Sequence, residues 1–326
     1  MRPLRERGRL SEVRAMRCIV IGATGHIGSW LVPTLVEAGH EVLAISRGQR
    51  QPYHSDSAWS MIRHLELDRT EPAFAQRVAQ LRPDVVVDLI CFDVESAATL
   101  VEALDGVVGL FLHCGTLWVH GRPQRVPYDE TAAREPFGEY GIRKAAIEQY
   151  LLARAQHGFP ATVLHPGHIS GPGWLPINPA GNLNPEVYER LASGRPVLLP
   201  DDGSARLQHV HAADVARAFA LAIGQPDRAI GEAFHIAARE PVTLRAYAAA
   251  VAGWYGRTAT LEYLPLREWE QQASAEDARL TRDHVLHSPA ASIAKAELRL
   301  GFAPQYSALE AVRSAISATP LLGQSR

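Results

Sequence analysis

A glycine-rich turn near the amino terminus constrains this chain more than any other feature of its sequence. Residues 22–28 read GATGHIG, follow the short apolar run RCIVI, and precede a segment of helical length. Glycines in such a turn let a pyrophosphate approach the helix N-terminus, whose free N–H groups and dipole favour anions. The arrangement predicts a dinucleotide site, with a glycine-rich turn that binds nothing as the alternative. The expected contact residues are Gly22, Thr24, Gly25, His26, Ile27 and Gly28.

Short apolar runs and helix-length segments continue to alternate after this turn. The runs HEVLAIS, PDVVVDLICF, GVVGLFLHCG and PATVLHPG are separated by segments with helical spacing. Such alternation predicts an α/β fold of the Rossmann type, a doubly wound parallel sheet. A loop rich in Pro, Gly and Asn follows at residues 170–185, and most of the remaining chain has helical spacing. We therefore expect a smaller, mainly helical C-terminal substrate lobe.

The domain boundaries follow from this pattern. Residues 1–15 are basic and precede the first strand, so we expect a disordered or non-native N-terminal extension there. The dinucleotide-binding domain is expected at residues 16–170 together with about 205–238, and the substrate lobe at residues 171–204 and 239–320.

Composition points to a small-molecule partner. The chain has 33 Lys plus Arg against 35 Asp plus Glu, a formal net charge of −2, so we expect no nucleic-acid or membrane partner. It also has no apolar segment long enough to span a bilayer. The three cysteines, Cys18, Cys91 and Cys114, each lie in an apolar run that predicts a strand. Such cysteines are typical of reduced core thiols in a cytoplasmic protein.

The end of the second predicted strand indicates which dinucleotide is bound. Rossmann folds that bind NAD carry an acidic residue here for the ribose hydroxyls, whereas this chain has Ser46 and Arg47. A hydroxyl and a guanidinium suit a 2′-phosphate, so the sequence favours NADP, with NAD possible and Arg50 as further help. A solvated loop residue is the alternative for Arg47. Asp68, after HLEL, is placed to contact the adenine amino group or to form a turn.

Two residues four apart form a candidate catalytic pair. Tyr140 and Lys144 lie near the start of a predicted helix, residues 139–157, where this spacing places them on one face. An ammonium near a phenol favours the phenolate, so we expect Lys144 to lower the pKa of Tyr140. Such a phenol can exchange a proton with a substrate oxygen during hydride transfer. Thr116, which follows GLFLHCG, supplies a hydroxyl that can orient a substrate carbonyl.

These motifs, in this order, resemble those of a known family. GATGHIG, CGTLWVHG, YGIRK and HPGHISGPG are similar to the motifs of extended short-chain dehydrogenases/reductases, the NAD-dependent epimerase/dehydratase family, over nearly the whole chain. The resemblance implies that Thr116 is the catalytic Ser/Thr, Tyr140 the general acid/base, and Lys144 the residue that holds the nicotinamide ribose. It also implies that Pro166 and Gly167 border the nicotinamide. A homodimer formed through two helices of each subunit is a further implication.

The sequence departs from this family where the substrate binds. Many members that act on nucleotide sugars carry an arginine where this chain has Leu207, and an arginine and an asparagine where it has His165 and His168. A nucleotide-sugar substrate is therefore not favoured, although Arg206 lies next to the missing arginine and can compensate for it. The expected substrate contacts are His168, Trp174, Asn178, Asn182 and Arg206, with an ordered loop capped by asparagines as the alternative.

Histidines are frequent in the segments that should approach the cleft. His209 and His211 lie on the same face of a predicted strand, so two metal ligands are geometrically possible. No third ligand has a matching spacing and hydride transfer needs no metal, so we expect no metal site. We expect His211 to have a packing role.

Three functions fit these features. The first is an oxidoreductase that transfers hydride between NADP(H) or NAD(H) and a carbonyl or alcohol of a small, sugar-like or secondary-metabolite substrate. The second is a redox-neutral sugar epimerase or dehydratase with retained NAD, for which Glu139 and Asp93 are the nearby candidate acids. The third is a relative that senses a cofactor or binds nucleic acid without catalysis, which the complete set of Thr116, Tyr140 and Lys144 disfavours.

Overall fold

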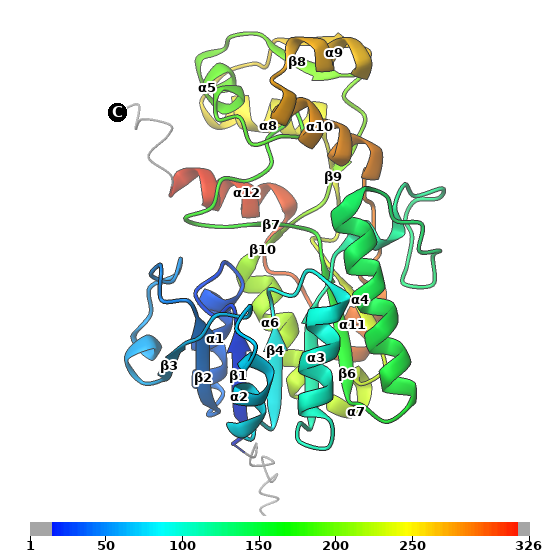
Figure 1. Ribbon diagram of the computed structural model, residues 1–326. Helices are drawn as coiled ribbons and strands as arrows, with labels where there is room; N and C mark the ends of the chain where they lie inside the picture. The colour runs from blue at the N-terminus through cyan, green and yellow to red at the C-terminus, as the bar shows by residue number, and fades with distance from the viewer. Residues whose placement is uncertain (1–14, 319–326) are drawn as a thin grey trace, which may run out of the picture.

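A seven-stranded parallel sheet forms the centre of the protein. The structure, a computed structural model, describes residues 15–318, and the extension expected at residues 1–15 lies outside this range except for its last residue. The sheet contains β1 (Arg17–Ile21), β2 (Glu41–Ser46), β3 (Arg63–Glu66), β4 (Val85–Asp88), β5 (Leu110–Cys114), β6 (Ala161–Pro166) and β11 (Ala233–Ile236). Its strand order is β11-β6-β5-β4-β1-β2-β3, and every neighbouring pair is parallel (Figure 1).

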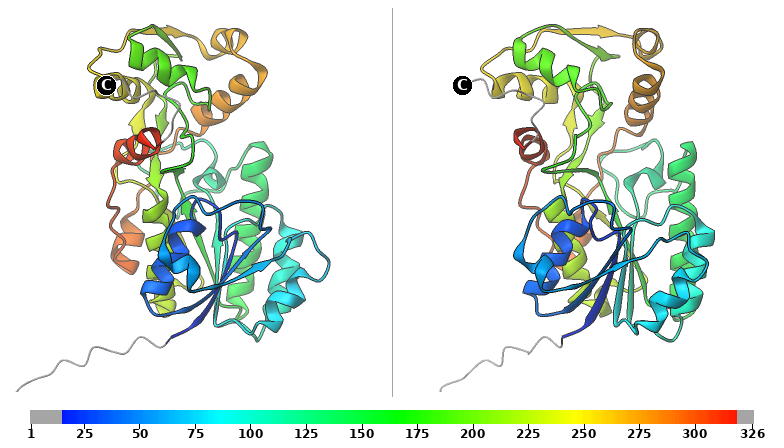
Figure 2. Two further views of the ribbon diagram at one scale, coloured as in Figure 1. Left: turned by 90° about the vertical axis from the view of Figure 1, so that its left-hand side faces the viewer. Right: turned by 60° about the vertical axis from the view of Figure 1, so that its left-hand side comes forward.

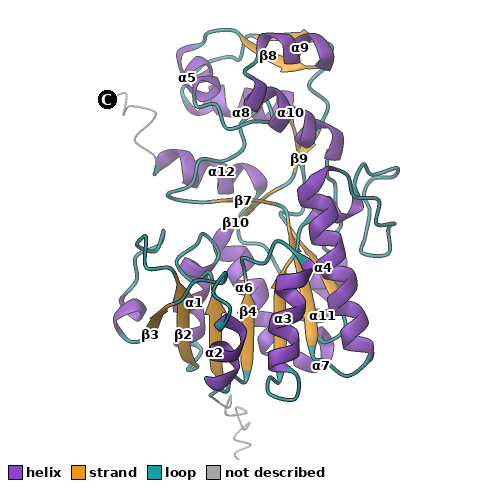
Figure 3. Ribbon diagram, viewed as in Figure 1, coloured by secondary structure: helices purple, strands orange, loops and turns teal. Residues whose placement is uncertain are grey.

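Helices cover both faces of this sheet (Figure 3). They are α1 (Gly28–Glu37), α2 (Phe74–Gln80), α3 (Val94–Leu104), α4 (Gly138–Gln156), α6 (Ala212–Ile223), α7 (Pro226–Ala229), α11 (Ala294–Leu300), and the 3-10 helices η1 (Ser57–Ser60) and η2 (Leu117–His120). Residues of α1, α6 and α11 share one apolar cluster with the sheet, and residues of α2, α3 and α4 share another. Because successive side chains of a strand alternate, Val20 enters the first cluster and Ile21 the second. Strands buried on both sides explain the continuous apolar runs, and the predicted fold class is confirmed.

The remaining elements form a smaller lobe beyond the carboxyl ends of the central strands (Figures 1 and 2). Its strands are β7 (His168–Ser170), β8 (Val197–Pro200), β9 (Arg206–Leu207), β10 (His209–His211), β12 (Val242–Thr243) and β13 (Leu261–Leu264). Its helices are α5 (Glu186–Ser193), α8 (Leu244–Trp254), α9 (Leu266–Gln272), α10 (Ala275–His287) and α12 (Ala308–Ser317). The strands pair two by two, as β7 with β10, β9 with β12 and β8 with β13. None of the helices within residues 15–318 is both long and apolar enough to cross a membrane.

All three cysteines are buried free thiols. Cys18 and Cys114 lie in β1 and β5 as predicted, but Cys91 lies in the loop after β4. The strand ends early because the Asp88 carboxylate accepts a hydrogen bond from the Ile90 N–H at 3.3 Å and turns the chain. Burial raises the pKa of Cys18 and Cys91 to about 12 and that of Cys114 to about 11. The thiols therefore stay protonated at neutral pH and act as core residues.

Candidate active site

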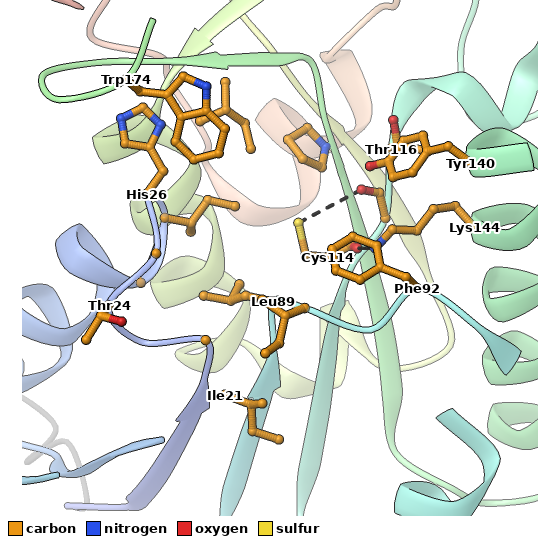
Figure 4. A pocket seen from close by; sticks show the side chains of 18 of the residues that line it. Ile21, Thr24, His26, Leu89, Phe92, Cys114, Thr116, Tyr140, Lys144 and Trp174 are labelled. Atoms are coloured by element: carbon orange, nitrogen blue, oxygen red, sulfur yellow. Dashed lines mark hydrogen bonds between the residues drawn. The ribbon is translucent and has the colours of Figure 1, made fainter. Parts of the chain in front are cut away.

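A cavity of about 880 Å³ lies between the carboxyl ends of the central strands and the smaller lobe. This edge is where open α/β sheets bind their ligands. Figure 4 shows Thr116, Tyr140 and Lys144 on one side of the cavity, and His26 and Trp174 on the other. The predicted site residues on its wall are Gly22, Thr24, Gly25, His26, Ile27, Gly28, Ser46, Arg47, Asp68, Thr116, Tyr140, Lys144, Pro166, Gly167, His168 and Trp174.

The glycine-rich turn has the geometry that close contact with a ligand requires. Gly22 has a φ of +84°, and a Cβ at this position would lie 2.6 Å from Cγ2 of Ile90. A Cβ on Gly28, where α1 begins, would lie 2.4 Å from the carbonyl oxygen of Ala23. A larger residue at either position would displace the backbone of the turn. Both glycines line the cavity, next to the N-terminus of α1. The turn fits the pyrophosphate of a dinucleotide.

Hydrogen-bond donors gather at the end of the cavity next to β2. Arg47 is exposed on the cavity wall, and Arg50 donates to the hydroxyl of Tyr53 at 2.5 Å. The Ser46 hydroxyl pairs with Nε2 of His64 at 2.7 Å. The sequence pattern does not reveal His64, because only the pairing of β2 with β3 brings it to this place. The hydroxyl and the guanidinium groups on the cavity wall together suit a phosphate, and His64 contacts only the hydroxyl.

Asp68 forms the turn that was one of its two expected roles. Its Oδ1 accepts hydrogen bonds from the main-chain N–H and the hydroxyl of Thr70, at 2.9 and 2.8 Å. These two bonds lower the pKa of Asp68, so its carboxylate is ionised at neutral pH. Because Asp68 also lines the cavity, its contact with adenine stays a prediction.

Helix α4 presents Tyr140 and Lys144 to the cavity on one face, as their spacing predicts. The Tyr140 side chain lies near that of Thr116, which follows β5 and lines the same cavity. Lys144 is 2% exposed, and its Nζ donates to the carbonyl oxygens of Cys91 and Cys114 at 2.8 and 2.7 Å. The structure thus brings the three predicted catalytic residues together (Figure 4).

The predicted lowering of the Tyr140 pKa is wrong. Desolvation by the surrounding protein, and then Cys114, raise the pKa of Tyr140 even though 43% of the residue is exposed to the cavity and solvent, and Thr116 offsets only part of this rise. The reason is that the Lys144 ammonium is held by two main-chain carbonyls and lies 4.8 Å from the centre of the Phe92 ring. Burial also lowers the pKa of Lys144. Tyr140 is therefore a protonated phenol at neutral pH, the form that donates a proton.

His168 lines the cavity and has one ring nitrogen without a partner among the described residues. Its Nδ1 accepts from the N–H of Gln208 at 3.3 Å, which leaves the ring proton on Nε2. This Nε2 is buried and has no hydrogen-bond partner within the part of the chain that the structure describes. Burial, and then the nearby His284 and His209, hold the pKa of His168 well below its usual value. The ring is therefore a neutral donor.

Trp174 packs over the glycine-rich turn. Its indole stacks on the His26 ring with centroids 4.5 Å apart, and Tyr53 meets the same ring edge-on at 5.4 Å. Burial lowers the pKa of His26 to about 4, so this ring is neutral at physiological pH. The loop that follows β7 therefore packs against the glycine-rich turn and forms part of the cavity wall.

Three of the predicted substrate contacts do not lie on the cavity wall. Asn178 donates to Oδ1 of Asn182 at 2.5 Å, and Asn182 donates to the Thr281 hydroxyl of α10 at 3.0 Å. Because these buried amides are used within the protein, the structure supports the alternative of an ordered loop held by its asparagines. The main-chain N–H of Arg206 donates to the Ser288 hydroxyl at 2.9 Å, and Arg206 stands apart from the described cavity lining.

The two histidines considered as metal ligands have structural partners. Nδ1 of His211 accepts from the Ala213 N–H at 3.1 Å and caps α6, and its ring stacks on Tyr306 at 4.0 Å. Nδ1 of His209 pairs with the Ser170 hydroxyl at 2.9 Å. Within residues 15–318, no group of three or more His, Cys, Asp or Glu side chains is placed to hold a metal ion. The packing role expected for His211 is confirmed.

Similarity to known proteins places these features in context. The model of the NAD dependent epimerase/dehydratase family matches residues 18–237. The chain is similar to 2′-dehydrokanamycin reductase from Streptomyces kanamyceticus, with 32% identity over 275 residues, 81% of this chain and 74% of the relative. It is similar to chloroplast stem-loop binding protein of 41 kDa b from Arabidopsis thaliana, with 28% identity over 306 residues, 90% of this chain and 76% of that protein. The solved complex of Thermus thermophilus UDP-glucose 4-epimerase with NAD shares the fold, with a TM-score of 0.71 and 23% identity over 93% of this chain and 98% of that chain.

Proposed function

The chain belongs to the NAD dependent epimerase/dehydratase family, and from this premise we propose that it is an NADP-dependent reductase or dehydrogenase. It transfers hydride between the cofactor and a carbonyl or alcohol of a small, sugar-like or secondary-metabolite substrate. The observation that carries this proposal is the convergence of Thr116, Tyr140 and Lys144 on the cavity that the glycine-rich turn also lines. The 32% identical relative, which is named as a reductase, supports it.

Each catalytic side chain has one task. When bound, the nicotinamide supplies or accepts the hydride. The Tyr140 phenol donates its proton to the substrate oxygen as the carbonyl is reduced, and takes it back in the reverse direction. The Thr116 hydroxyl, which lines the same cavity as Tyr140, orients the same oxygen. Lys144 uses two of its three N–H groups on main-chain carbonyls, which leaves one for a ribose hydroxyl of the nicotinamide half.

The residues around the glycine-rich turn fit the rest of the cofactor. The N-terminus of α1 would hold the pyrophosphate, Ser46 and Arg47 the 2′-phosphate, and Asp68 the adenine amino group. Pro166 and Gly167 would border the nicotinamide. Residue 167 must be glycine, since a Cβ at this position would lie 2.2 Å from the carbonyl oxygen of Gln208.

The substrate side of the cavity suits a compound without a diphosphate. Of the cationic side chains on the described wall, Arg47 and Arg50 lie next to β2, Arg69 is paired with Asp88 at 2.7 Å, and Lys144 is held beside Tyr140. The wall near the smaller lobe is instead apolar and aromatic, with neutral imidazoles, and includes Trp118, His168, Ile169, Trp174, Leu175 and His284. We therefore assign His168 the role of donor to a substrate oxygen.

A dehydratase receives less support than a reductase. The Glu139 carboxylate pairs with Arg143 at 2.5 Å and is 76% exposed, and Asp93 caps α3 by accepting from the Ser96 N–H at 2.7 Å. Glu139 lies outside the described cavity wall, whereas Asp93 lines it but uses its Oδ1 to cap α3. A redox-neutral epimerase with retained NAD is the second candidate, because the matched family includes epimerases by name. A non-catalytic role is the third, because the Arabidopsis relative is named as a stem-loop binding protein.

The homodimer and the cytoplasmic location expected from the sequence stay predictions. So does the preference for NADP over NAD, which depends on Arg47.

Replacing Arg47 with serine is expected to weaken NADPH binding about 10- to 100-fold and to leave NADH binding within about threefold, because a hydrogen bond to a charged group contributes roughly 1.5–3 kcal/mol. Fluorescence titration with each nucleotide measures both dissociation constants. The same change at Arg195, an exposed arginine away from the cavity wall, is the control and should alter neither. An equal loss of both affinities in Arg47→Ser, or no loss at all, would identify Arg47 as a solvated loop residue.

A further inference from the structure

The main chain of Thr116 is held by a buried histidine. The Thr116 N–H donates to Nδ1 of His165 at 2.9 Å, and His165 is fully buried in β6. Gly115 makes this contact possible, since a Cβ at that position would lie 2.3 Å from the same Nδ1. Thr116 and His165 are 49 residues apart, and the parallel pairing of β5 with β6 brings them together. The contact therefore depends on the pairing of β5 with β6.

This contact fixes where the imidazole carries its proton. A ring nitrogen that accepts from an N–H has no proton of its own, so the proton of His165 is on Nε2. Nε2 donates to Oε1 of Glu148 at 3.0 Å, and Arg134 donates to both oxygens of that carboxylate at 2.7 and 3.2 Å. Burial alone would raise the pKa of Glu148, but His165 and Arg134 lower it well below its usual range. The carboxylate is charged and holds the ring.

Glu148 lies on the helix that carries the catalytic pair. Tyr140, Lys144 and Glu148 follow one another at intervals of four on α4 and so share one face. Tyr140 lies near the Thr116 side chain, while Glu148 reaches the Thr116 main chain through His165. The backbone of Thr116 is therefore linked to the helix that carries Tyr140.

We propose that His165, oriented by Glu148, is a positioning residue that sets the place of the Thr116 hydroxyl relative to the Tyr140 phenol. The proposal rests on the proposed hydride-transfer function, in which both hydroxyls meet the substrate oxygen. His165 does not line the cavity and acts through Thr116. Its loss should therefore reduce kcat and not raise KM, since a misplacement of about 1 Å costs about 10²-fold in rate.

Nitrogen-15 NMR of the full chain with NADP⁺ added tests the contact without any substitution. We expect His165 as the neutral tautomer with its proton on Nε2, and a Thr116 amide proton that exchanges slowly with solvent. The signals are assigned by their loss in His165→Asn. A proton on Nδ1 of His165, or a Thr116 amide that exchanges as fast as an exposed one, would overturn the proposal.

Two substitutions at one position test the effect on turnover. His165→Asn and His165→Leu both lose the link to Glu148, but only asparagine places an acceptor oxygen near the position of Nδ1. With NADPH and 2′-dehydrokanamycin as the probe substrate, kcat should fall about 10- to 100-fold in His165→Leu and about threefold in His165→Asn, with KM within about threefold of the parent. His235→Leu is the control, because His235 is equally buried and is paired with His165 in register on β11. It should keep its kcat.

Tyr140→Phe in the same assay separates this proposal from the function on which it rests. If Tyr140→Phe loses turnover while His165→Leu keeps it, the positioning role is overturned and the catalytic role of Tyr140 stands. If both lose turnover and His165→Asn retains most of it, both proposals are supported. If Tyr140→Phe keeps the turnover of the parent, the hydride-transfer function itself is overturned.

Discussion

Turnover is expected to fall about 10³-fold when Tyr140 is replaced by phenylalanine, because proton transfer by a positioned side chain contributes about 10²–10⁴-fold. NADPH affinity should stay within about threefold of the parent, since the substitution keeps the ring beside Phe92 and Trp118, whose centroids lie 6.5 and 5.8 Å away. NADPH consumption with 2′-dehydrokanamycin, a probe chosen from the name of the similar reductase, measures turnover, and fluorescence titration measures the affinity. The two readouts separate a lost proton donor from a damaged cofactor site.

The same change at Tyr150 is the matched control. Tyr150 lies on α4 as well, its hydroxyl accepts from Arg154 at 3.5 Å, and it stands outside the described cavity wall. Tyr150→Phe should turn over like the parent. If Tyr140→Phe were as active as Tyr150→Phe, Tyr140 would not be the proton donor, and the proposed function would lose its basis.

Acid is expected to unfold the protein well before its carboxylates are protonated. Burial lowers the pKa of several histidines to about 4, namely His26, His120, His211, His284 and His287. It lowers that of His209 to about 3. An unfolded histidine has a pKa of about 6.5, so below that pH the unfolded state binds more protons and stability falls as the pH falls. At pH 5, one histidine with a folded pKa of about 4 lowers the free energy of unfolding by about 2 kcal/mol. The combined effect of several such histidines approaches the total free energy of unfolding of a domain, about 5–15 kcal/mol.

Urea unfolding followed by circular dichroism measures this effect. Between about pH 7.5 and 5.5 we expect the free energy of unfolding to fall by at least about 4 kcal/mol. His211→Asn keeps an acceptor for the Ala213 N–H at the start of α6 and removes one titrating ring, so it should reduce the proton uptake on unfolding by about one. His157→Gln, at an exposed position after α4, is the control substitution. A free energy of unfolding that stays constant over this range would contradict the expectation.

Features with local geometry are predictable from the sequence. A strand, a tight turn and a helix are formed by adjacent residues, so Gly22 and Gly28 can be assigned to the turn before any fold is known. The spacing of Tyr140 and Lys144 fixes a helix face in the same way. The ends of parallel strands meet at one edge of the sheet, and this rule places Thr116 on the cavity wall.

Contacts between distant segments are not predictable in this way. The bond between His165 and the Thr116 N–H depends on which strands are neighbours, and the stacking of Trp174 on His26 depends on how a loop folds back. The four-residue spacing of Tyr140 and Lys144 likewise does not predict the hydrogen-bond partners of the Lys144 ammonium. In the structure, these partners are two main-chain carbonyl oxygens. The pKa of a side chain follows from such partners, which explains why the direction predicted for Tyr140 is wrong.

The asparagines of the 170–185 loop show a second limit. Loops rich in Pro, Gly and Asn commonly carry binding residues, which is why Asn178 and Asn182 were expected to contact substrate. In the structure, the Oδ1 of Asn178 accepts from the Ala180 N–H at 2.8 Å, and that of Asn182 accepts from the Asn184 N–H at 3.0 Å. A buried loop needs such acceptors for its own backbone, and composition does not distinguish that need from a binding role.

The nucleotide that the protein carries after purification tests the central claim most directly. The protein is purified without added cofactor and denatured, and any released nucleotide is identified by mass spectrometry. We predict little bound nucleotide and, on titration, tighter binding of NADPH than of NADH, because a reductase exchanges its cosubstrate in every turnover. Retained NAD(H) would contradict this account and would instead indicate an epimerase that recycles its cofactor in place.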